Sequence, residues 1–322
     1  AEQSVDGFLR WSLDWFSPGR AGVCAFFLVS GYVIPISLER DGDLRRFAVG
    51  RVSRLYPLYW ASLGAALLLD RAGVPALPTD FDLRLPASAW VNLTMGQELV
   101  GVPHAIGVYY TLTIELVWYL GCAVLFALGW LAATERLATL ALGGLALVGV
   151  GVPLVLDRHV PFSTGFYLVT MLLGTALARR DAGTLDPRRF RLLLATAAAI
   201  GAAGCWANYV HAPGGADPDG PLGLTSAFVP WVAGYAAVLV LHRYRHLRFP
   251  RVATWLGVVS YGVYLLHPLV LAVLRHRGAG PAVAILGTLA GSAVVAGIAH
   301  RLVEVPGQAL GRRLRAWLPI RA

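Results

Sequence analysis

Two segments near the start of the chain, FFLVSGYVIPIS (residues 26–37) and RVSRLYPLYW (residues 51–60), govern how the remainder is interpreted. The first is an apolar run typical of a membrane helix, and the second begins with Arg51 and Arg54 and continues into aromatic residues. Residues three apart project from the same side of a helix, so the two guanidinium groups can bind one polyanion. Arginine and aromatic residues also flank membrane helices as interfacial anchors. The pair alone therefore leaves phosphate binding and anchoring open.

The composition indicates an integral membrane protein. Hydrophobic residues make up 57% of the 322 residues and charged residues only 14%, and the mean hydropathy is +0.63. These values lie far from the average of soluble proteins. The net charge of +9 would favour nucleic-acid binding in a soluble domain. In a membrane protein, the distribution of basic residues instead reflects which loops face the cytoplasm. We therefore expect the lipid bilayer as a partner and no nucleic acid.

Nine windows are long enough to cross a hydrocarbon layer of ~30 Å, which needs about 20 apolar residues per helix. They predict an all-α, polytopic membrane helix bundle. Residues 1–20 are expected to form an extracytoplasmic interfacial segment, residues 21–303 the membrane domain, and residues 304–322 a cytoplasmic basic tail. The windows are 21–37, 55–70, 106–130, 137–156, 161–178, 192–210, 224–241, 252–274 and 281–303.

Arginine counts predict which connections face the cytoplasm. One alternate set of connections holds twenty arginines and the other holds seven. Because cytoplasmic loops are enriched in basic residues, the first set is assigned to the cytoplasm, together with Arg51 and Arg54. An odd number of spans then places residue 1 outside and the C-terminus inside. The first set comprises 38–54, 131–136, 179–191, 242–251 and the segment from residue 301 onward.

Few ionisable residues fall within the predicted spans, and Glu115 and His267 are the principal candidates. An ionised carboxylate at mid-bilayer costs about 2.5 kcal/mol or more, so such a residue usually faces a polar cavity and marks function. Both are placed in the outer-middle third of oppositely directed helices, where a carboxylate can raise the basicity of an imidazole. Two alternatives stay open: a helix-bridging Glu115, and a neutral His267 bonded to a carbonyl.

Other patterns carry weaker predictions. His242 and His246 have the spacing of a metal pair, but arginines surround them and we expect no carboxylate near them, so we predict a basic surface and no metal. Three cysteines in apolar segments predict neither disulfides nor a metal site. The GxxxG at Gly287 and Gly291, with further glycines from residue 143 to residue 151, predicts close helix packing.

Five segments resemble, in order, the signatures of the acyltransferase 3 family of multi-spanning membrane acyltransferases. They extend over nearly the whole chain, and five such motifs in the family's order are a specific signal. The segments are FFLVSGYVI (26–34), RVSRLYPLYW (51–60), YTLTIELVWYL (110–120), LGVVSYGVYLLHP (256–268) and RLVEVP (301–306).

The resemblance implies a ten-helix bundle that moves an acyl group, often acetyl, from acyl-CoA to a hydroxyl of a sugar or other acceptor. Arg51 and Arg54 match the arginine pair expected to bind the CoA phosphates, Glu115 matches an acidic signature residue, and His267 matches the histidine that ends a late signature. Within the matching segments, Ser30 and Tyr110 are predicted substrate-binding residues. Acyl-CoA is expected as a donor co-substrate, with no bound cofactor.

One feature departs from the family pattern. The family's first helix carries an arginine followed eleven residues later by a histidine thought to act as catalytic base, and nothing before Phe26 matches it. A missing first helix, which would make ten spans, is favoured over a base located elsewhere or an inactive protein. Tyr110 and Thr111 also stand where the family often has Trp and Ser, which affects the expected acceptor pocket.

The sequence therefore predicts a multi-pass O-acyltransferase of a bacterial inner membrane, with acyl-CoA as donor and a carbohydrate or glycosylated small molecule as acceptor. Abundant arginine without lysine fits a GC-rich bacterial genome. Two alternatives belong to other classes. One is a proton-coupled transporter or flippase of a polar or anionic substrate, which paired broken helices would favour. The other is a non-catalytic membrane scaffold.

Overall fold

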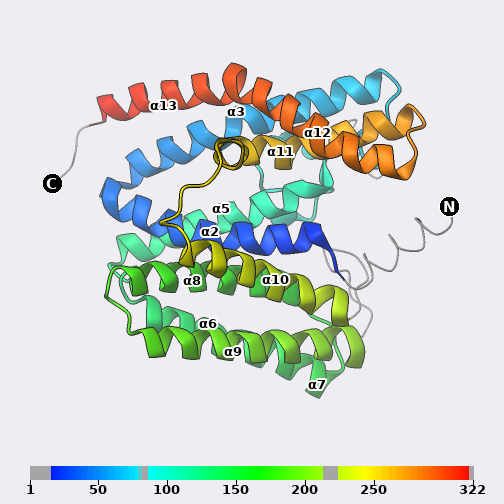
Figure 1. Ribbon diagram of the computed structural model, residues 1–322. Coiled ribbons are helices and arrows are strands. Elements are labelled where there is room, and N and C mark those ends of the chain that lie inside the picture. The colour runs from blue at the N-terminus through cyan, green and yellow to red at the C-terminus, as the bar shows by residue number, and fades with distance from the viewer. Residues whose placement is uncertain (1–15, 80, 82–85, 213–223, 319–322) are drawn as a thin grey trace. The chain divides into compact units, whose positions relative to one another are not determined.

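The computed structural model describes residues 16–79, 81, 86–212 and 224–318 (Figure 1), and within these ranges the regular structure is helical throughout, as predicted. Most of the interfacial segment expected at residues 1–20 lies outside the described residues. Six stretches of the described chain are helical, long and apolar enough to cross a membrane: Pro18–Asp41, Gly107–Ala127, Thr134–Leu156, Pro187–His211, Arg251–His276 and Pro281–Trp317.

The other three predicted windows also fall in helices, but these helices are shorter or more polar. They are α3 (Leu44–Arg71), α8 (Phe162–Asp181) and α10 (Leu224–Arg243). Helix α8 is buried along most of its length and carries Ser163, Thr170 and Thr175 among its buried residues. A helix that faces protein can hold such side chains, because neighbouring backbone groups satisfy them. A count of nine spans stays a prediction.

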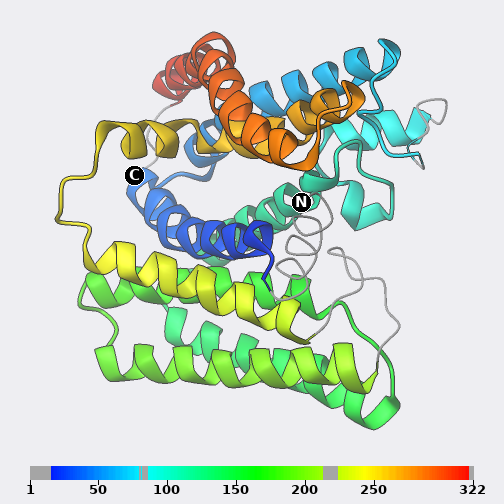
Figure 2. The same cartoon turned by 45° about the vertical axis from the view of Figure 1, so that its right-hand side comes forward.

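The chain divides into two compact units, and each is described by itself. The first unit comprises residues 1–40 and 117–246, and the second comprises residues 41–116 and 247–322. In the first unit, α8, α9 and α10 lie side by side (Figure 2). Its described elements are most of α2 (Pro18–Asp41), the end of α5 (Tyr110–Ala127), α6 (Thr134–Ala146), η3 (Leu147–Gly151), α7 (Val152–Leu156), α8, α9 (Pro187–Trp206), η4 (Ala207–His211) and α10.

Glycines allow the helices of the first unit to pack with their backbones in contact. A Cβ atom at Gly31 of α2 would lie 1.9 Å from the Met171 carbonyl oxygen, and one at Gly174 of α8 would lie 2.1 Å from the Leu28 carbonyl oxygen. A Cβ atom at Gly149 would lie 2.5 Å from the Phe162 ring. The close packing predicted for the glycines between residues 143 and 151 is thus confirmed at Gly149.

Helix ends of the first unit that carry arginine gather at one end of the unit. Glu39 of α2 accepts a 2.9 Å hydrogen bond from Arg179 of α8, and Glu135 of α6 lies 3.0 Å from Arg189 of α9. We call this end the basic end; its arginines are Arg40, Arg136, Arg179, Arg180, Arg188, Arg189, Arg191, Arg243 and Arg245. These arginines belong to the connections that the arginine counts assigned to the cytoplasm.

The second unit contains a helical hairpin formed by α11 and α12. A Cβ atom at Gly287 would lie 2.9 Å from Leu274, and one at Gly291 would lie 3.0 Å from Val270. The packing role predicted for this GxxxG pair is confirmed. The described elements of the unit are α3, α4 (Pro86–Leu93), η1 (Gln97–Val100), η2 (Gly107–Tyr109), the first turns of α5, α11 (Arg251–His276), α12 (Pro281–Ala299), η5 (His300–Glu304) and α13 (Val305–Trp317).

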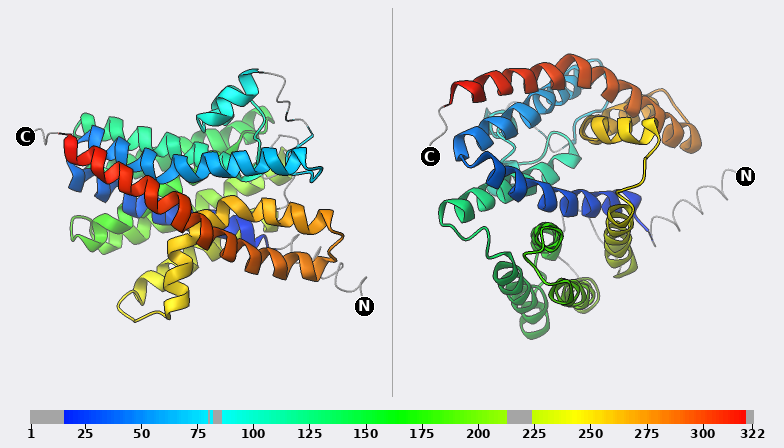
Figure 3. Two further views of the ribbon diagram at one scale, coloured as in Figure 1. Left: turned by 90° about the horizontal axis from the view of Figure 1, so that it is seen from above. Right: turned by 60° about the vertical axis from the view of Figure 1, so that its left-hand side comes forward.

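The segment predicted as a basic tail forms helix α13, which packs along the first half of α3 (Figures 1 and 3). A Cβ atom at Gly311 would lie 2.0 Å from Ser53 Oγ, and one at Gly307 would lie 2.7 Å from Pro57. Arg315 forms a 2.7 Å ion pair with Asp41. Helix α13 therefore covers one face of the helix that carries the RVSRLYPLYW segment.

Candidate functional site

The arginine pair lies near the beginning of α3 in the second unit. The Asp43 side chain caps this helix by accepting hydrogen bonds from the backbone N–H groups of Arg45 and Arg46, at 2.7 and 2.9 Å. Arg51 is half-buried, with its guanidinium group 5.2 Å from the centre of the Phe47 ring, whereas Arg54 is exposed. The stacked ring fixes Arg51 while Arg54 stays accessible to an anion from water.

Helix geometry places the two arginines relative to the face of α3 that α13 covers. At about 100° per residue, Arg51 and Arg54 project about 160° and 100° away from Ser53. Ser53 faces α13, and its hydroxyl donates a 2.7 Å hydrogen bond to the Val49 carbonyl oxygen. The two arginines therefore lie about 60° apart on α3. Arg51 faces away from α13, and Arg54 borders the covered face, because a Cβ atom at Gly50 would lie 3.2 Å from Arg315 of α13.

The acidic candidate lies on α5 of the same unit. Glu115 is buried, with 4% of its surface exposed, and Tyr110 is half-buried at the first turn of the helix. Thr111 lies four residues before Glu115 and so on the same face of α5. The Thr111 hydroxyl lies 2.7 Å from the Tyr264 hydroxyl of α11. The face that carries Glu115 thus meets α11 one turn away from the carboxylate.

His267 lies on α11 one turn beyond Tyr264. Its Nδ1 atom is 2.8 Å from the Tyr264 carbonyl oxygen, and because a carbonyl only accepts, Nδ1 is the donor of this hydrogen bond. This is the carbonyl-bonded arrangement that the sequence left open. With Nδ1 engaged in this way, Nε2 is the ring nitrogen that remains for a proton transfer. A direct pairing of His267 with Glu115 stays a prediction.

Sequence reasoning missed the residues that join these helices. The Tyr261 hydroxyl donates a 2.9 Å hydrogen bond to the Leu55 carbonyl oxygen of α3, and the Tyr264 hydroxyl donates a 3.0 Å bond to the Val108 carbonyl oxygen. Tyr261, Tyr264 and His267 are spaced by three and form one stripe on α11. That spacing is the signal in the sequence, and it connects the arginine-bearing helix to the helix of the buried acid.

A second buried carboxylate, Glu304, occurs in the π-helical turn η5, and was not singled out from the sequence. It is 3% exposed, and its Oε2 atom lies 3.3 Å from His300 Nδ1. A Cβ atom at Gly262 of α11 would lie 3.3 Å from Glu304 Oε1. Single π-helical turns often occur at functional sites. The RLVEVP motif thus packs a carboxylate beside the tyrosine stripe of α11.

The connection between α3 and α5, which includes α4 and η1, covers the part of these two helices that is remote from the arginines. Tyr59 donates to the Asn92 carbonyl oxygen, and the Ser62 and Tyr109 hydroxyls lie 2.7 Å apart. The Asn92 side chain donates to the Pro103 carbonyl oxygen at 3.0 Å. Buried polar groups satisfied in this way hold a loop in one conformation. The loop therefore shields the polar N-terminal end of α5, which begins at Tyr110.

Two further predicted features lie in the first unit. Ser30 is buried on α2. His242 has a carboxylate partner, because its Nε2 atom lies 2.7 Å from Asp181 Oδ2, so the expectation that no carboxylate is near was wrong. Asp181 is 61 residues away in the chain, and only the packing of α8 against α10 brings it close. Within the described ranges no group of three potential metal ligands occurs.

Comparisons with known proteins identify one family. Residues 3–300 match the model of the acyltransferase 3 family, which is described as an acyltransferase domain. The match covers most of the 322 residues and includes Arg51, Arg54, Glu115 and His267, whereas Glu304 lies just beyond it. No curated protein and no solved structure matches the chain.

Proposed function

The chain belongs to the acyltransferase 3 family and is a membrane acyltransferase; we propose that it transfers a short acyl group, such as acetyl, from acyl-CoA to a hydroxyl of a carbohydrate or glycosylated acceptor. The bacterial inner membrane is the proposed location. One observation carries the proposal: in the second unit, the tyrosine stripe of α11 joins the helix of the arginine pair, of which Arg54 is exposed, to the helix of a buried carboxylate. A phosphorylated donor needs cations for its phosphate groups at one end of the site and a proton-handling group near its reactive end.

The donor is proposed to bind by its nucleotide at Arg51 and Arg54. The CoA nucleotide carries phosphate groups, and arginine binds phosphate through paired, charge-assisted hydrogen bonds. Arg51 is half-buried on the side of α3 that faces away from α13, and Arg54 is exposed. The pantetheine arm would extend from this end of α3 along α11, placing the thioester near Glu115 and His267.

The reaction is proposed to begin with attack of the acceptor hydroxyl oxygen on the thioester carbonyl carbon. A carbon–oxygen bond forms, the carbon–sulfur bond breaks, and CoA leaves as the thiolate. The hydroxyl proton passes to a base and then to the departing sulfur. His267 and the buried Glu115 are the two residues that we propose for handling this proton.

The polar cover over the beginning of α5 supports an acceptor that is itself polar. Tyr110 is half-buried at the first turn of the helix that carries Glu115, beside the Thr111 and Tyr264 hydroxyls, which bond to each other. Sugar hydroxyls are recognised by a few well-placed hydrogen bonds of this kind. Tyr110 is the residue that we propose to contact the acceptor.

Acceptor-dependent release of CoA tests the proposal. The purified chain in detergent is incubated with radiolabelled acetyl-CoA and separate panels of sugars, glycolipids and glycosylated metabolites. Free thiol and labelled product are both measured, and they are expected to appear together and in equal amounts. A transporter or scaffold would bind or move substrate without releasing thiol. Absence of thiol release with every acceptor and with longer acyl-CoA donors would contradict the proposal.

A further inference from the structure

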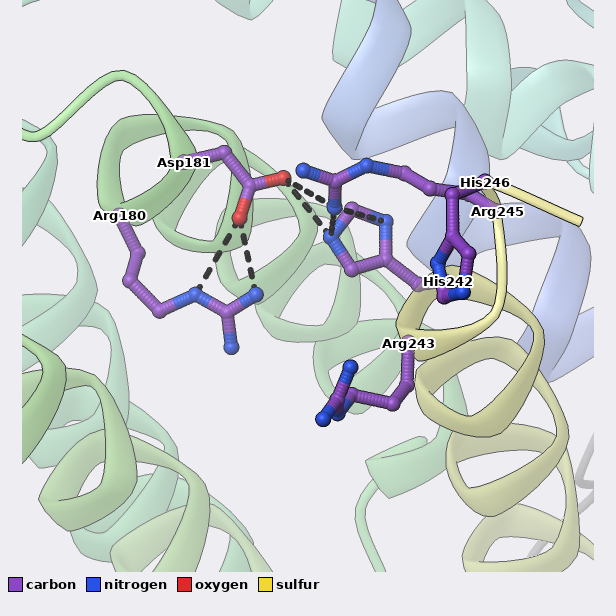
Figure 4. A pocket seen from close by; sticks show the side chains of 6 residues that line it. All are labelled: Arg180, Asp181, His242, Arg243, Arg245 and His246. Carbon is purple, nitrogen blue, oxygen red and sulfur yellow. Dashed lines mark hydrogen bonds and ion pairs between the residues drawn. The ribbon is translucent and has the colours of Figure 1, made fainter.

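The basic end of the first unit contains a cavity of about 360 Å³ that the proposed reaction does not use (Figure 4). It lies where the C-terminal end of α8 meets the C-terminal end of α10. We call it the basic pocket, and the residues that line it are Arg180, Asp181, His242, Arg243, Arg245 and His246. Its volume falls within the range of small-ligand sites.

Asp181 fixes the walls of the basic pocket. Its Oδ1 atom accepts a 2.8 Å hydrogen bond from Arg180. Its Oδ2 atom accepts from the Tyr32 hydroxyl at 3.1 Å, and lies 2.7 Å from His242 Nε2 and 3.1 Å from Arg245 Nη1. Figure 4 shows Arg180 and His242 approaching the carboxylate from different helices. The single carboxylate of the pocket is therefore surrounded by donors and is not available to hold a cation.

The cations of the basic pocket exceed what Asp181 can neutralise. Three arginines line the pocket and one carboxylate opposes them. Arg180 is held by Asp181 and by the Phe190 ring, 4.9 Å from its guanidinium carbon. Arg243 is exposed and, among the residues that the structure describes, forms no ion pair or hydrogen bond. The pocket thus presents preorganised positive charge, with Arg243 available to a ligand.

We infer that the basic pocket is an anion site that binds a phosphate group, supplied by a lipid headgroup or by a soluble phosphate ester. Arginine side chains held in place by a carboxylate lose little freedom on binding and present several N–H donors to phosphate oxygens. Basic pockets at the ends of membrane helices bind anionic headgroups by the same chemistry. The inference is independent of the acyl donor proposed for Arg51 and Arg54.

The lipid source is tested with the full chain in nanodiscs that contain equal amounts of phosphatidylglycerol and phosphatidylcholine. Native mass spectrometry counts the lipids retained after release. Arg243→Gln removes the available cation and leaves every described contact of Asp181 intact, so the fold is preserved. Preferential retention of phosphatidylglycerol is expected to fall about fivefold, as for loss of one arginine near a lipid surface.

The matched control is Arg191→Gln, which removes an exposed arginine of α9 at the same end without touching the basic pocket. It is expected to retain phosphatidylglycerol like the unmodified chain. Charge reversal sharpens the comparison, because Arg243→Glu places a second carboxylate in the pocket and should abolish the preference. Arg191→Glu should leave the preference in place. Screening by salt should weaken retention in the unmodified chain and have less effect on Arg243→Gln.

The soluble source is tested by equilibrium binding of coenzyme A to the same variants. A weaker affinity of Arg243→Gln for coenzyme A, relative to Arg191→Gln, assigns the pocket to a soluble ester. If Arg243→Gln retains less phosphatidylglycerol but binds coenzyme A as tightly as Arg191→Gln does, the pocket is assigned to a lipid headgroup. The Arg51→Ala, Arg54→Ala double variant reports separately on the proposed donor site. If Arg243→Gln binds both probes as tightly as Arg191→Gln does, the inference is overturned.

Discussion

The hydroxyl groups of Tyr264 and Thr111 lie 2.7 Å apart, and this contact joins α11 to the first turn of α5. His267 follows Tyr264 by one helical turn, and Glu115 follows Thr111 by one turn. Each of the two proposed proton-handling residues thus lies one turn from this contact, and because the helices run in opposite directions the two residues lie on opposite sides of it. The same tyrosine supplies the carbonyl that fixes the tautomer of His267.

We expect Tyr264→Phe to lower kcat about five- to tenfold, the effect of losing one hydrogen bond worth about 1 kcal/mol in a positioned site. The KM for acyl-CoA should change little, since the arginine pair is untouched. Steady-state kinetics of the purified variant measure both values. Tyr56→Phe is the matched control, because its hydroxyl also bonds to a carbonyl oxygen, that of Thr94, at 2.9 Å. An equal loss in both variants would argue against a positioning role.

Arg51→Ala combined with Arg54→Ala should raise the KM for acyl-CoA about tenfold to a hundredfold, as expected for losing charge-assisted contacts to phosphate. The remaining activity should be less sensitive to salt, because the screened interaction is gone. Initial rates over a range of donor and salt concentrations provide the measurement. Arg71→Ala, at the other end of α3, should leave KM unchanged. An unaltered KM in the double variant would refute the assigned role.

Glu115→Gln should lower kcat about a hundredfold or more, the range associated with groups that handle protons in catalysis. Expression and thermal unfolding should remain close to those of the unmodified chain, because the amide has the same shape. Turnover and melting temperature are measured on the same preparation. Glu135→Gln, which changes a partly exposed carboxylate in the other unit, is the control. Full activity of Glu115→Gln would remove this residue from the site.

Gly311→Ala should destabilise the protein by about 1–3 kcal/mol, as overpacking does, because its methyl group would lie 2.0 Å from Ser53 Oγ and 2.4 Å from Ser53 Cβ. The displacement of α13 should also raise the KM for acyl-CoA, since α13 supports the turn of α3 that carries the arginines. Thermal unfolding measures the loss of stability, and kinetics with varied acyl-CoA measure the change in KM. Gly257→Ala, where nothing lies within 4 Å of the new atom, is the control.

A compensating change makes the Gly311 prediction sharper. Ser53→Gly removes both atoms that the alanine methyl group would meet. The Ser53→Gly, Gly311→Ala double variant should therefore recover most of the stability lost in Gly311→Ala, as coupled neighbours do. If the double variant is no more stable than expected from adding the two single effects, contact between α13 and α3 is not the cause.

Tertiary packing produced what the sequence could not predict at the basic end. His242 is surrounded by arginines in the chain, and Asp181, on another helix, is the partner that organises them. The basic tail is a comparable case. Its glycines at positions 307 and 311 have the GxxxG spacing that predicts close packing, but the sequence does not tell that Pro57 and Ser53 of α3 are what they pack against. Both contacts join residues far apart in the chain, which local patterns cannot pair.

The sequence by itself determined the helical class, the membrane setting, the family, and the identities of Arg51, Arg54, Glu115 and His267 as candidates, because hydropathy, charge asymmetry and ordered motifs are local properties. Only the tertiary structure decided that tyrosines of α11 connect these helices, that His267 bonds to a carbonyl, and that Asp181 organises the basic pocket. The physical reason is that hydrogen bonds and ion pairs act over a few ångströms in space, whatever the distance along the chain.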